Sequence, residues 1–395
     1  MPISISVVMP CLNEASTLGF CIKEAQTALE KAGVHDTEII VADNGSTDGS
    51  QQLAQELGAN VIRVNQKGYG SALHAGISAA RYDWVFFADS DMSYDFRNLE
   101  HFIPEMHHQA DLIVGNRFKG HIDSGAMPFL HRYLGTPVIS VLGRRSFGVN
   151  LGDFNCGMRA IKKDAYVKLQ MQSGGMEYAS EMIAKAGLKK LDIREVPVDL
   201  RKDGRDRKPH LSTWQDGWKH LKLILLLSPK WLLLFPSLFF MIAGLLLGSI
   251  LLFNYVSISD LVLDIHTLYY ASIFFVVGFQ LFQFYLFAKL HGHKMGIYPK
   301  RKIVNDINRY FSFENSLILG SIIFLSGIFL SAVAVWQWKA SGFGPLDPVK
   351  IFRIIIPAGF CISIGIQSMV FGFMMYVFSS LKNNTDMQTT QATDN

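Results

Sequence analysis

The sequence predicts an α/β domain, built on a mostly parallel sheet with helices on both faces, followed by an all-α membrane region of four helices. Two observations support this fold class. In the first part of the chain, β-branched apolar runs alternate with stretches of helical periodicity, a pattern that is typical of parallel sheets. Beyond residue 230, uncharged apolar stretches long enough to cross a bilayer replace that pattern.

The strand–helix alternation can be followed residue by residue. The first expected strand covers residues 3–10 (ISISVVMP), and the helix after it has Gly33 as its expected stop. Apolar residues recur at helical spacing in that helix, at Leu18, Cys21, Ile22, Ala25 and Leu29. Further strands are expected over 38–43, 60–64 and 83–89, with helices over 50–57 and 69–80. In such sheets ligands bind outside the carboxyl ends of the strands.

Polar residues gather at those strand ends. Asn13 and Glu14 follow the first strand, the segment 43–48 follows the second, and Asp89 and Asp91 follow the fourth. The first strand is followed by PCLNEAS and not by G-x-G-x-x-G, and the Gly-rich piece at 68–70 lacks a third glycine. A dinucleotide-binding Rossmann motif and a Walker A motif are therefore both excluded.

Asp89 and Asp91 lie one residue apart where an apolar strand ends, in FFADSDMSYD. Two carboxylates at this spacing suit Mg²⁺ or Mn²⁺, which keep water ligands and share a diphosphate. A nucleotide sugar is a natural substrate for such a site, because its leaving group is a nucleoside diphosphate. The alternative is helix capping by Ser93 or Asp95, and for Asp95 capping is the favoured interpretation.

Four membrane spans are expected over 231–255, 267–288, 316–338 and 354–381. The loop between the second and third spans is basic, with Lys289, Lys294, Lys300, Arg301, Lys302 and Arg309, whereas the first loop carries only Asp260 and Asp264. The positive-inside rule then places the N-terminal domain and the C-terminus in the cytosol of a multi-pass inner or plasma membrane protein. The third loop gives a less clear signal for this orientation, because it also carries basic residues, Lys339, Lys350 and Arg353.

The domain boundaries follow from these patterns. Residues 1–212 are expected to form the cytosolic domain, 213–230 an interfacial amphipathic helix, 231–381 the membrane region and 382–395 a disordered polar tail. The interfacial helix would dock on lipid through Trp214, Trp218, Leu221, Ile224 and Leu225. In the first span, Gly244 and Gly248 form a GxxxG pattern for close helix packing.

Charge and cysteine content narrow the partners. The net charge of +4 suits anionic lipid headgroups better than nucleic acid, for which no basic and aromatic patch is present. The four cysteines lack metal-ligand spacing, so they are expected to be reduced packing residues. The sequence leaves a homo-oligomer open.

Several motifs occur in order over the first 120 residues: VVMPCLNE, VADNGSTDGS, GYGSALHAG, FFADSDMSYD and GNRF. Together with GDFNCGMRA they make the chain resemble family 2 glycosyltransferases of GT-A fold. The likeness is strongest to dolichol-phosphate mannose synthases and bacterial polyprenyl-phosphate glycosyltransferases. The resemblance implies transfer of a hexose from a UDP- or GDP-linked sugar to undecaprenyl or dolichyl phosphate, for cell-envelope glycans or protein glycosylation.

The resemblance also implies roles in donor binding. Asp89 and Asp91 match the metal-binding D-x-D pair. Pro10, Asn13 and Glu14 would line the nucleotide pocket, and Asp43 would contact the base. Ser46 and Asp48 would shape the turn, although the whole segment can also be a plain Asx turn. Gly68 and Gly70 would admit the nucleotide close to the backbone, or simply lead into a helix.

Other matched residues concern the acceptor. Arg117 in GNRF would hold phosphate, or form a surface ion pair. Asp153, Cys156, Gly157 and Arg159 match a segment near the acceptor. Glu177 and Glu181 lie four apart on an expected helix, where one would orient the sugar or both would face solvent. The basic segment 201–210 would close over phosphate, with Arg205 as the first choice of ligand and Arg207 as the second, or it would face lipid headgroups.

A phosphate acceptor explains the absence of a general base. A phosphate monoester is largely a dianion at neutral pH, so a single displacement with inversion needs only positioning and charge neutralisation. Two alternative functions remain open. A processive polysaccharide synthase typically carries Q-x-x-R-W, which this sequence lacks. A membrane transport module that only binds nucleotide would not need the Asp-x-Asp pair.

Overall fold

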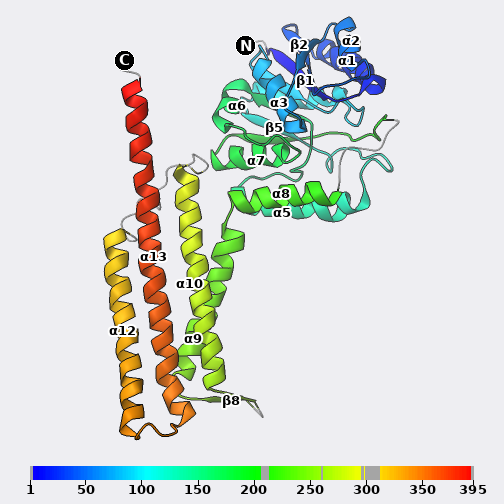
Figure 1. Ribbon diagram of the computed structural model, residues 1–395. Helices are drawn as coiled ribbons and strands as arrows, with labels where there is room; N and C mark the ends of the chain where they lie inside the picture. Colours follow the sequence, from blue (N-terminus) through cyan, green and yellow to red (C-terminus); the bar gives the residue numbers. More distant parts are fainter. Residues whose placement is uncertain (1–2, 206–212, 259–260, 295–297, 299–311, 393–395) are drawn as a thin grey trace. The chain divides into compact units, whose positions relative to one another are not determined.

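The computed structural model describes residues 3–205, 213–258, 261–294, 298 and 312–392. The chain divides into two compact units, Met1–Ser228 and Pro229–Asn395 (Figure 1). The helix expected at the membrane interface, α8 (Thr213–Leu227), belongs to the first unit.

The first unit is built on a seven-stranded sheet of order β3-β2-β1-β4-β6-β5-β7. The strands are β1 (Ile5–Cys11), β2 (Thr37–Asp43), β3 (Asn60–Arg63), β4 (Trp84–Phe87), β5 (Leu112–Asn116), β6 (Arg159–Lys162) and β7 (Ile193–Pro197). All neighbouring strands are parallel except β6, which runs antiparallel to β4 and β5. The predicted mostly parallel sheet is confirmed.

Helices cover both faces of this sheet. They are α1 (Ala15–Lys31), α2 (Ser50–Glu56), α3 (Tyr69–Ala79), α4 (Leu99–His107), α5 (Thr136–Phe147), α6 (Lys163–Leu169) and α7 (Tyr178–Leu188), with α8 at the end. Successive strand residues point to opposite faces, and the β1 residues from Ile5 to Met9 are all buried. A Cβ at Gly76 of α3 would lie 2.4 Å from Val8 Cγ1, so the glycine lets α3 lie directly on β1.

Within its described residues, the second unit holds four helices that are long and apolar enough to span a membrane, over Lys230–Leu251, Ile265–His293, Phe313–Ala340 and Pro348–Phe378. These spans belong to a helical turn η3 (Lys230–Leu234) with α9 (Phe235–Leu251), α10 (Ile265–Lys294), α12 (Phe313–Ala340) and α13 (Pro348–Ala392). A hairpin of β8 (Val256–Ile258) and β9 (Leu261–Leu263) joins the first two spans. The polar residues 382–392, expected to be a disordered tail, continue α13 as helix.

Glycines set the close packing of the spans. A Cβ at Gly244 of α9 would lie 2.6 Å from Ala271 O of α10, whereas at Gly248 its nearest neighbour would be 4.0 Å away. Gly244 therefore acts as the GxxxG pattern predicted, and Gly248 contributes little. Gly327 makes the same kind of contact between α12 and α13, because its Cβ would lie 2.7 Å from Ala358 O.

An ion pair explains one basic residue of the third loop. Arg353 of α13 binds Asp264, at the start of α10, with Nη2 2.7 Å from Oδ1. The pair therefore joins the start of α10 to α13 within the second unit. Asp260 and the loop residues Lys300, Arg301, Lys302 and Arg309 lie outside the described residues.

Candidate active site

The site forms where β1 and β4 end. Glu14 follows β1, Asp91 follows β4, and Arg205 reaches both from a segment nearly two hundred residues along the chain. Arg205 Nε and Nη2 lie 2.8 and 2.7 Å from Glu14 Oε1, and its Nη1 lies 2.9 Å from Asp91 Oδ2. Glu14 and Asp91 are buried. The structure thus brings three of the predicted residues together in one charged cluster.

Asp89 faces the same cluster. Its Oδ1 atom is buried and has no hydrogen-bond partner among the described residues. Burial, and then the negative charge of Asp91, raise the pKa of Asp89 to about 6, while the Tyr69 hydroxyl partly offsets these effects. A carboxylate in this state is stabilised by an added positive charge.

These residues fit a divalent cation. No group of three or more His, Cys, Asp or Glu side chains within the described ranges is arranged to hold a metal. Asp89 and Asp91 can offer two carboxylates, and the uncommitted Asp89 Oδ1 is the kind of hard oxygen that Mg²⁺ and Mn²⁺ prefer. A site with so few protein ligands leaves coordination positions for water and for a diphosphate.

The turns after β1 and β2 are bonded to each other. The Asn13 N–H donates to Ser46 Oγ at 2.8 Å, and the Ala15 N–H donates to Asp48 Oδ2 at 2.9 Å. Asn13 has φ +57°, a left-handed conformation that asparagine tolerates. Ser46 and Asp48 therefore hold the turn after β1, beside Pro10, whose carbonyl accepts a hydrogen bond from Ser90 Oγ.

Asp43 closes its own turn. Its Oδ2 accepts hydrogen bonds from the backbone N–H groups of Gly45 and Ser46, at 2.9 and 3.1 Å, and from Gln51 Nε2 at 2.6 Å. The Asx-turn alternative is therefore present, while the predicted contact with the base stays a prediction.

The glycines at 68 and 70 admit a neighbouring backbone. A Cβ at Gly68, which has φ +132°, would lie 2.2 Å from Gly174 O, and one at Gly70 would lie 2.5 Å from Ser173 O. The Ser71 N–H also donates to Gly174 O. This contact gives the two glycines a packing function independent of any nucleotide.

The segment around GDFNCGMRA lies behind Asp89. Arg117 pairs with the fully buried Asp153, and the Gly157 N–H donates to Tyr94 Oη at 2.7 Å. Arg159 is also buried, and its guanidinium donates to the carbonyls of Phe154, Cys156 and Ala179. Arg159 thus braces this loop against α7. Cys11, Cys21 and Cys156 are free and buried, as expected.

Glu177, the N-cap residue of α7, and Glu181, within its first turn, differ. Glu181 is buried, pairs with Lys185 at 2.6 Å and accepts the N–H groups of Gln172 and Ser173. The solvent-facing alternative is therefore wrong for Glu181, because this side chain closes the loop that precedes α7. Glu177 instead has a buried Oε2 atom with no hydrogen-bond partner among the described residues.

The start of the basic segment runs along the turn after β4. Arg201 pairs with Glu24 and Asp95, and Asp95 caps the turn η1 (Phe96–Asn98) by accepting the Arg97 N–H. The capping interpretation of Asp95 is confirmed. Arg207 lies outside the described residues.

Sequence reasoning missed two tyrosines at the site. Tyr69 lies near Asp89, and Tyr94 holds Gly157. Both belong to the sequence motifs GYGSALHAG and FFADSDMSYD. Their position inside these motifs was the sequence signal that could have identified the two tyrosines as site residues.

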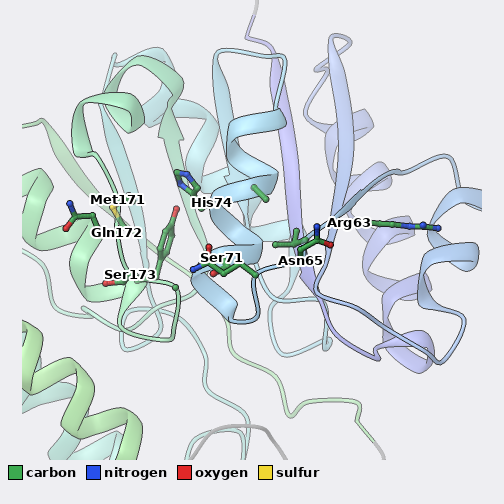
Figure 2. Close-up of a pocket in the computed structure, with 12 residues that line it drawn as sticks. Arg63, Asn65, Ser71, His74, Met171, Gln172 and Ser173 are labelled. Atoms are coloured by element: carbon green, nitrogen blue, oxygen red, sulfur yellow. The ribbon is translucent and has the colours of Figure 1, made fainter. Parts of the chain in front are cut away.

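A cavity of about 450 Å³ lies beside the Gly68–Gly174 contact (Figure 2). Its lining comes from the end of β3, from α3 and from the loop before α7, and includes Asn65, Ser71, His74 and Gln172. His74 Nδ1 is hydrogen-bonded to the hydroxyl of Tyr166, which is in turn hydrogen-bonded to the hydroxyl of Tyr178. None of the described residues that line this cavity is an Asp or Glu.

An apolar helix face lies on the same unit. Six large apolar side chains are exposed from just before the short π-helix η2 (His131–Gly135) into α5, and we call them the α5 apolar face: Phe129, Leu130, Tyr133, Leu134, Val138 and Val141. The opposite side of α5 is buried through Ile139 and Phe147. The helix α8 lies beside α5 (Figure 1). It exposes Trp218 but buries Ile224. Ile224 therefore faces the protein, and the prediction that it docks on lipid is wrong.

Two family models match the chain. "Glycosyl transferase family 2" matches residues 6–169, and "Glycosyltransferase family 2 C-terminal transmembrane region" matches residues 286–379. The chain is 32% identical over 374 residues to the low-salt glycan biosynthesis hexosyltransferase Agl6 of Haloferax volcanii, covering 93% of this chain and 87% of that protein.

Other similar proteins match about half of the chain. A dolichyl-phosphate hexose transferase of Haloferax volcanii is 26% identical, over 52% of this chain and 86% of that protein. Among solved structures, a glucosyl-3-phosphoglycerate synthase from Mycobacterium tuberculosis aligns with a TM-score of 0.46 at 22% identity. This alignment covers 56% of this chain and 79% of that one.

Proposed function

The chain belongs to glycosyltransferase family 2, and we propose that it transfers a hexose from a nucleoside-diphosphate sugar to a polyprenyl phosphate. It is a membrane glycosyltransferase with a GT-A domain. The observation that carries the proposal is the cluster of Glu14, Asp89, Asp91 and Arg205 at the ends of β1 and β4. A diphosphate and its counter-ion need this combination of acids and a cation.

Donor binding uses the strand ends. Pro10, Asn13, Glu14 and Asp43 would line the nucleotide pocket, which Ser46 and Asp48 hold in shape. Asp89 and Asp91 would hold Mg²⁺ or Mn²⁺, and the bound ion supplies neutralisation of the charge on the departing nucleoside diphosphate. The buried, unpartnered Glu177 Oε2 supports a contact with a sugar hydroxyl.

The reaction is a single displacement. An oxygen of the acceptor phosphate attacks the anomeric carbon, the bond from that carbon to the diphosphate breaks, and the configuration inverts. No side chain has to remove a proton, because a phosphate monoester is largely a dianion at neutral pH. The protein supplies position and positive charge, and Arg205, Arg207 and Arg117 are the proposed phosphate ligands.

A lipid acceptor is supported by the apolar surface of the first unit. The α5 apolar face exposes six large apolar side chains in a row, and Arg132, Arg144 and Arg145 lie on the same helical segment. A basic helix with such a face suits an anionic membrane surface. We place this unit on the cytosolic side, since the loop between the second and third spans is the basic one.

A donor screen tests the proposal. Membranes that contain the full chain are incubated with radiolabelled UDP-glucose, GDP-mannose or UDP-N-acetylglucosamine and with undecaprenyl or dolichyl phosphate, and the products are extracted into organic solvent. We expect one labelled lipid that mild acid hydrolyses, and we expect none from Asp91→Asn protein that still binds the nucleotide. Label in a long polymer would indicate a processive synthase, and no label with any donor would contradict the proposal.

A further inference from the structure

Arg205 occupies a position where two catalytic carboxylates need a positive charge. Its guanidinium makes two contacts to Glu14 Oε1 and one, through Nη1, to Asp91 Oδ2 at 2.9 Å. The side chain is 17% exposed, so the cluster is screened only weakly by solvent. In this state Arg205 does for Asp91 what a metal ion would do in the loaded enzyme.

The backbone that carries Arg205 is fixed on the turn after β4. The Arg201 N–H donates to Ser93 O at 2.8 Å, and the Gly204 N–H donates to Asp91 O at 2.9 Å. Leu200 also forms a β-bridge with Tyr94. The Cα of Arg205 is therefore held beside the metal-binding turn, and rotation of its side chain alone can change the partner of Nη1.

We infer that Arg205 is the counter-ion of Asp91 in the metal-free protein. A divalent cation displaces the Arg205 guanidinium from Asp91, and Arg205 then binds the diphosphate of the donor. The inference rests on the proposed function, because the cation and the diphosphate are those of the proposed reaction. Glu14 is the pivot. Its carboxylate keeps Nε and Nη2 of Arg205 while Nη1 turns from Asp91 to a phosphate oxygen.

The exchange follows from competition for one oxygen. Mg²⁺ approaches an oxygen ligand to about 2.0–2.1 Å, and Asp91 Oδ2 is the atom that Arg205 Nη1 now contacts. The two cations also repel each other at this distance. A divalent cation that binds without nucleotide therefore competes with Arg205 for Asp91. A cation that binds together with a diphosphate does not, because a phosphate oxygen replaces Asp91 as the hydrogen-bond acceptor of Nη1. Metal and nucleotide binding should be strongly coupled, and Arg205 should be the source of the coupling.

Binding of Mn²⁺ to the full chain in nanodiscs tests the inference, with free Mn²⁺ measured by electron paramagnetic resonance. Without nucleotide, Arg205→Gln is expected to bind Mn²⁺ about ten-fold more tightly than wild type, because the competitor is gone. UDP and GDP, added in separate titrations, should each increase the Mn²⁺ affinity. This increase is expected to be about ten-fold smaller in the variant than in wild type. If Arg205 had only a structural role, its substitution would weaken Mn²⁺ binding both without and with nucleotide.

Arg201→Gln is the matched control. It makes the same change four residues upstream, where the arginine side chain pairs with Glu24 and Asp95 and not with Asp89 or Asp91, so Mn²⁺ affinity should not change. If Arg205→Gln does not fold, the same Mn²⁺ titrations of Arg205→Lys test the inference. Lys keeps one charge but cannot bridge two carboxylates, so Mn²⁺ alone should again bind more tightly than to wild type.

Two outcomes overturn the inference and separate it from the proposed function. If wild type transfers sugar and binds Mn²⁺ with nucleotide, but the folded Arg205 variant binds Mn²⁺ alone no more tightly, the exchange is wrong and the function stands. If wild type binds no Mn²⁺ in the presence or absence of UDP and GDP, the metal-dependent function and the exchange both fall.

Discussion

Arg117 and Asp153 form a buried two-pronged ion pair, with Nε 2.7 Å from Oδ2 and Nη2 2.9 Å from Oδ1. The pair joins the end of β5 to the loop before β6. Burial alone would lower the pKa of Arg117, but the Asp153 carboxylate raises it well above its usual range. The arginine therefore stays charged in a buried position near Asp89.

Asp153→Asn should be strongly destabilising. It leaves the Arg117 guanidinium buried without its counter-charge, and the loss of one partner of a buried pair costs about 3 kcal/mol or more. The midpoint of thermal unfolding of the detergent-solubilised chain measures the loss. The double variant Asp153→Asn with Arg117→Met should recover part of the stability, because it removes the orphaned charge. A single variant that unfolds like wild type would show that solvent already screens this pair.

Asp89→Asn should stabilise the metal-free protein at neutral pH. The pKa of Asp89 is raised from 3.8 to about 6 in the folded state, so the fold prefers the protonated carboxyl. The stability from this group is complete below pH 3.8 and is lost as the pH rises through about 6. At a pH of about 7.5 the variant should gain up to about 3 kcal/mol over wild type.

Unfolding in the presence of EDTA at several pH values measures this gain. The difference between Asp89→Asn and wild type should narrow as the pH falls from about 7.5 to about 5, because wild type then becomes protonated too. Glu100→Gln is a suitable control, since this exposed glutamate lies outside the cluster. A gain that is independent of pH would mean that the charge of Asp89 is not its cause.

Much of the fold and part of the site could be predicted from the sequence, because the signals are local. Buried strands read as apolar runs, and the polar residues directly after β1, β2 and β4 mark the binding edge. The strand β6 (Arg159–Lys162) was not predicted. It has only four residues and begins and ends with a basic one, so its pairing with β4 and β5 rests on contacts distant in sequence.

Side-chain partners across long sequence distances could not be predicted either. Arg205 and Glu14 are separated by 191 positions, and no local pattern links them. Arg159 is similar, because its burial against three carbonyls depends on how a loop folds around it. The α5 apolar face did leave a signal, PFLHRYLGTPVISV. Its Gly135 and Pro137 read as helix breakers, although proline is acceptable in the first turn of a helix.

Gly68→Ala should destabilise the first unit and weaken nucleotide binding. Its φ of +132° is a conformation that other residues rarely adopt, and the new Cβ would lie 2.2 Å from Gly174 O. The loop before α7 would have to move away from α3. Gly58→Ala is the control, because Gly58 also has a positive φ, of +79°, but has nothing within 4 Å of an added Cβ.

The control should lose about 1 kcal/mol from backbone strain alone, and Gly68→Ala should lose clearly more. Thermal unfolding and UDP or GDP titration of the two variants make the comparison. Equal losses would show that the loop at residue 174 yields easily, and that the close approach at Gly68 is not a constraint.

Charges on the α5 apolar face should impair transfer to a bilayer-embedded acceptor. Leu134→Asp with Val138→Asp places two carboxylates on a face that we propose lies on anionic lipid, where they are repelled and cost desolvation. Sugar transfer to polyprenyl phosphate in liposomes should fall at least about ten-fold, while Mn²⁺ and nucleotide binding stay unchanged, because the site itself is intact. Val167→Asp is the matched control, since Val167 of α6 is 70% exposed but lies outside this face. If both variants transfer sugar at the wild-type rate in liposomes, the α5 apolar face does not contact the membrane during the reaction.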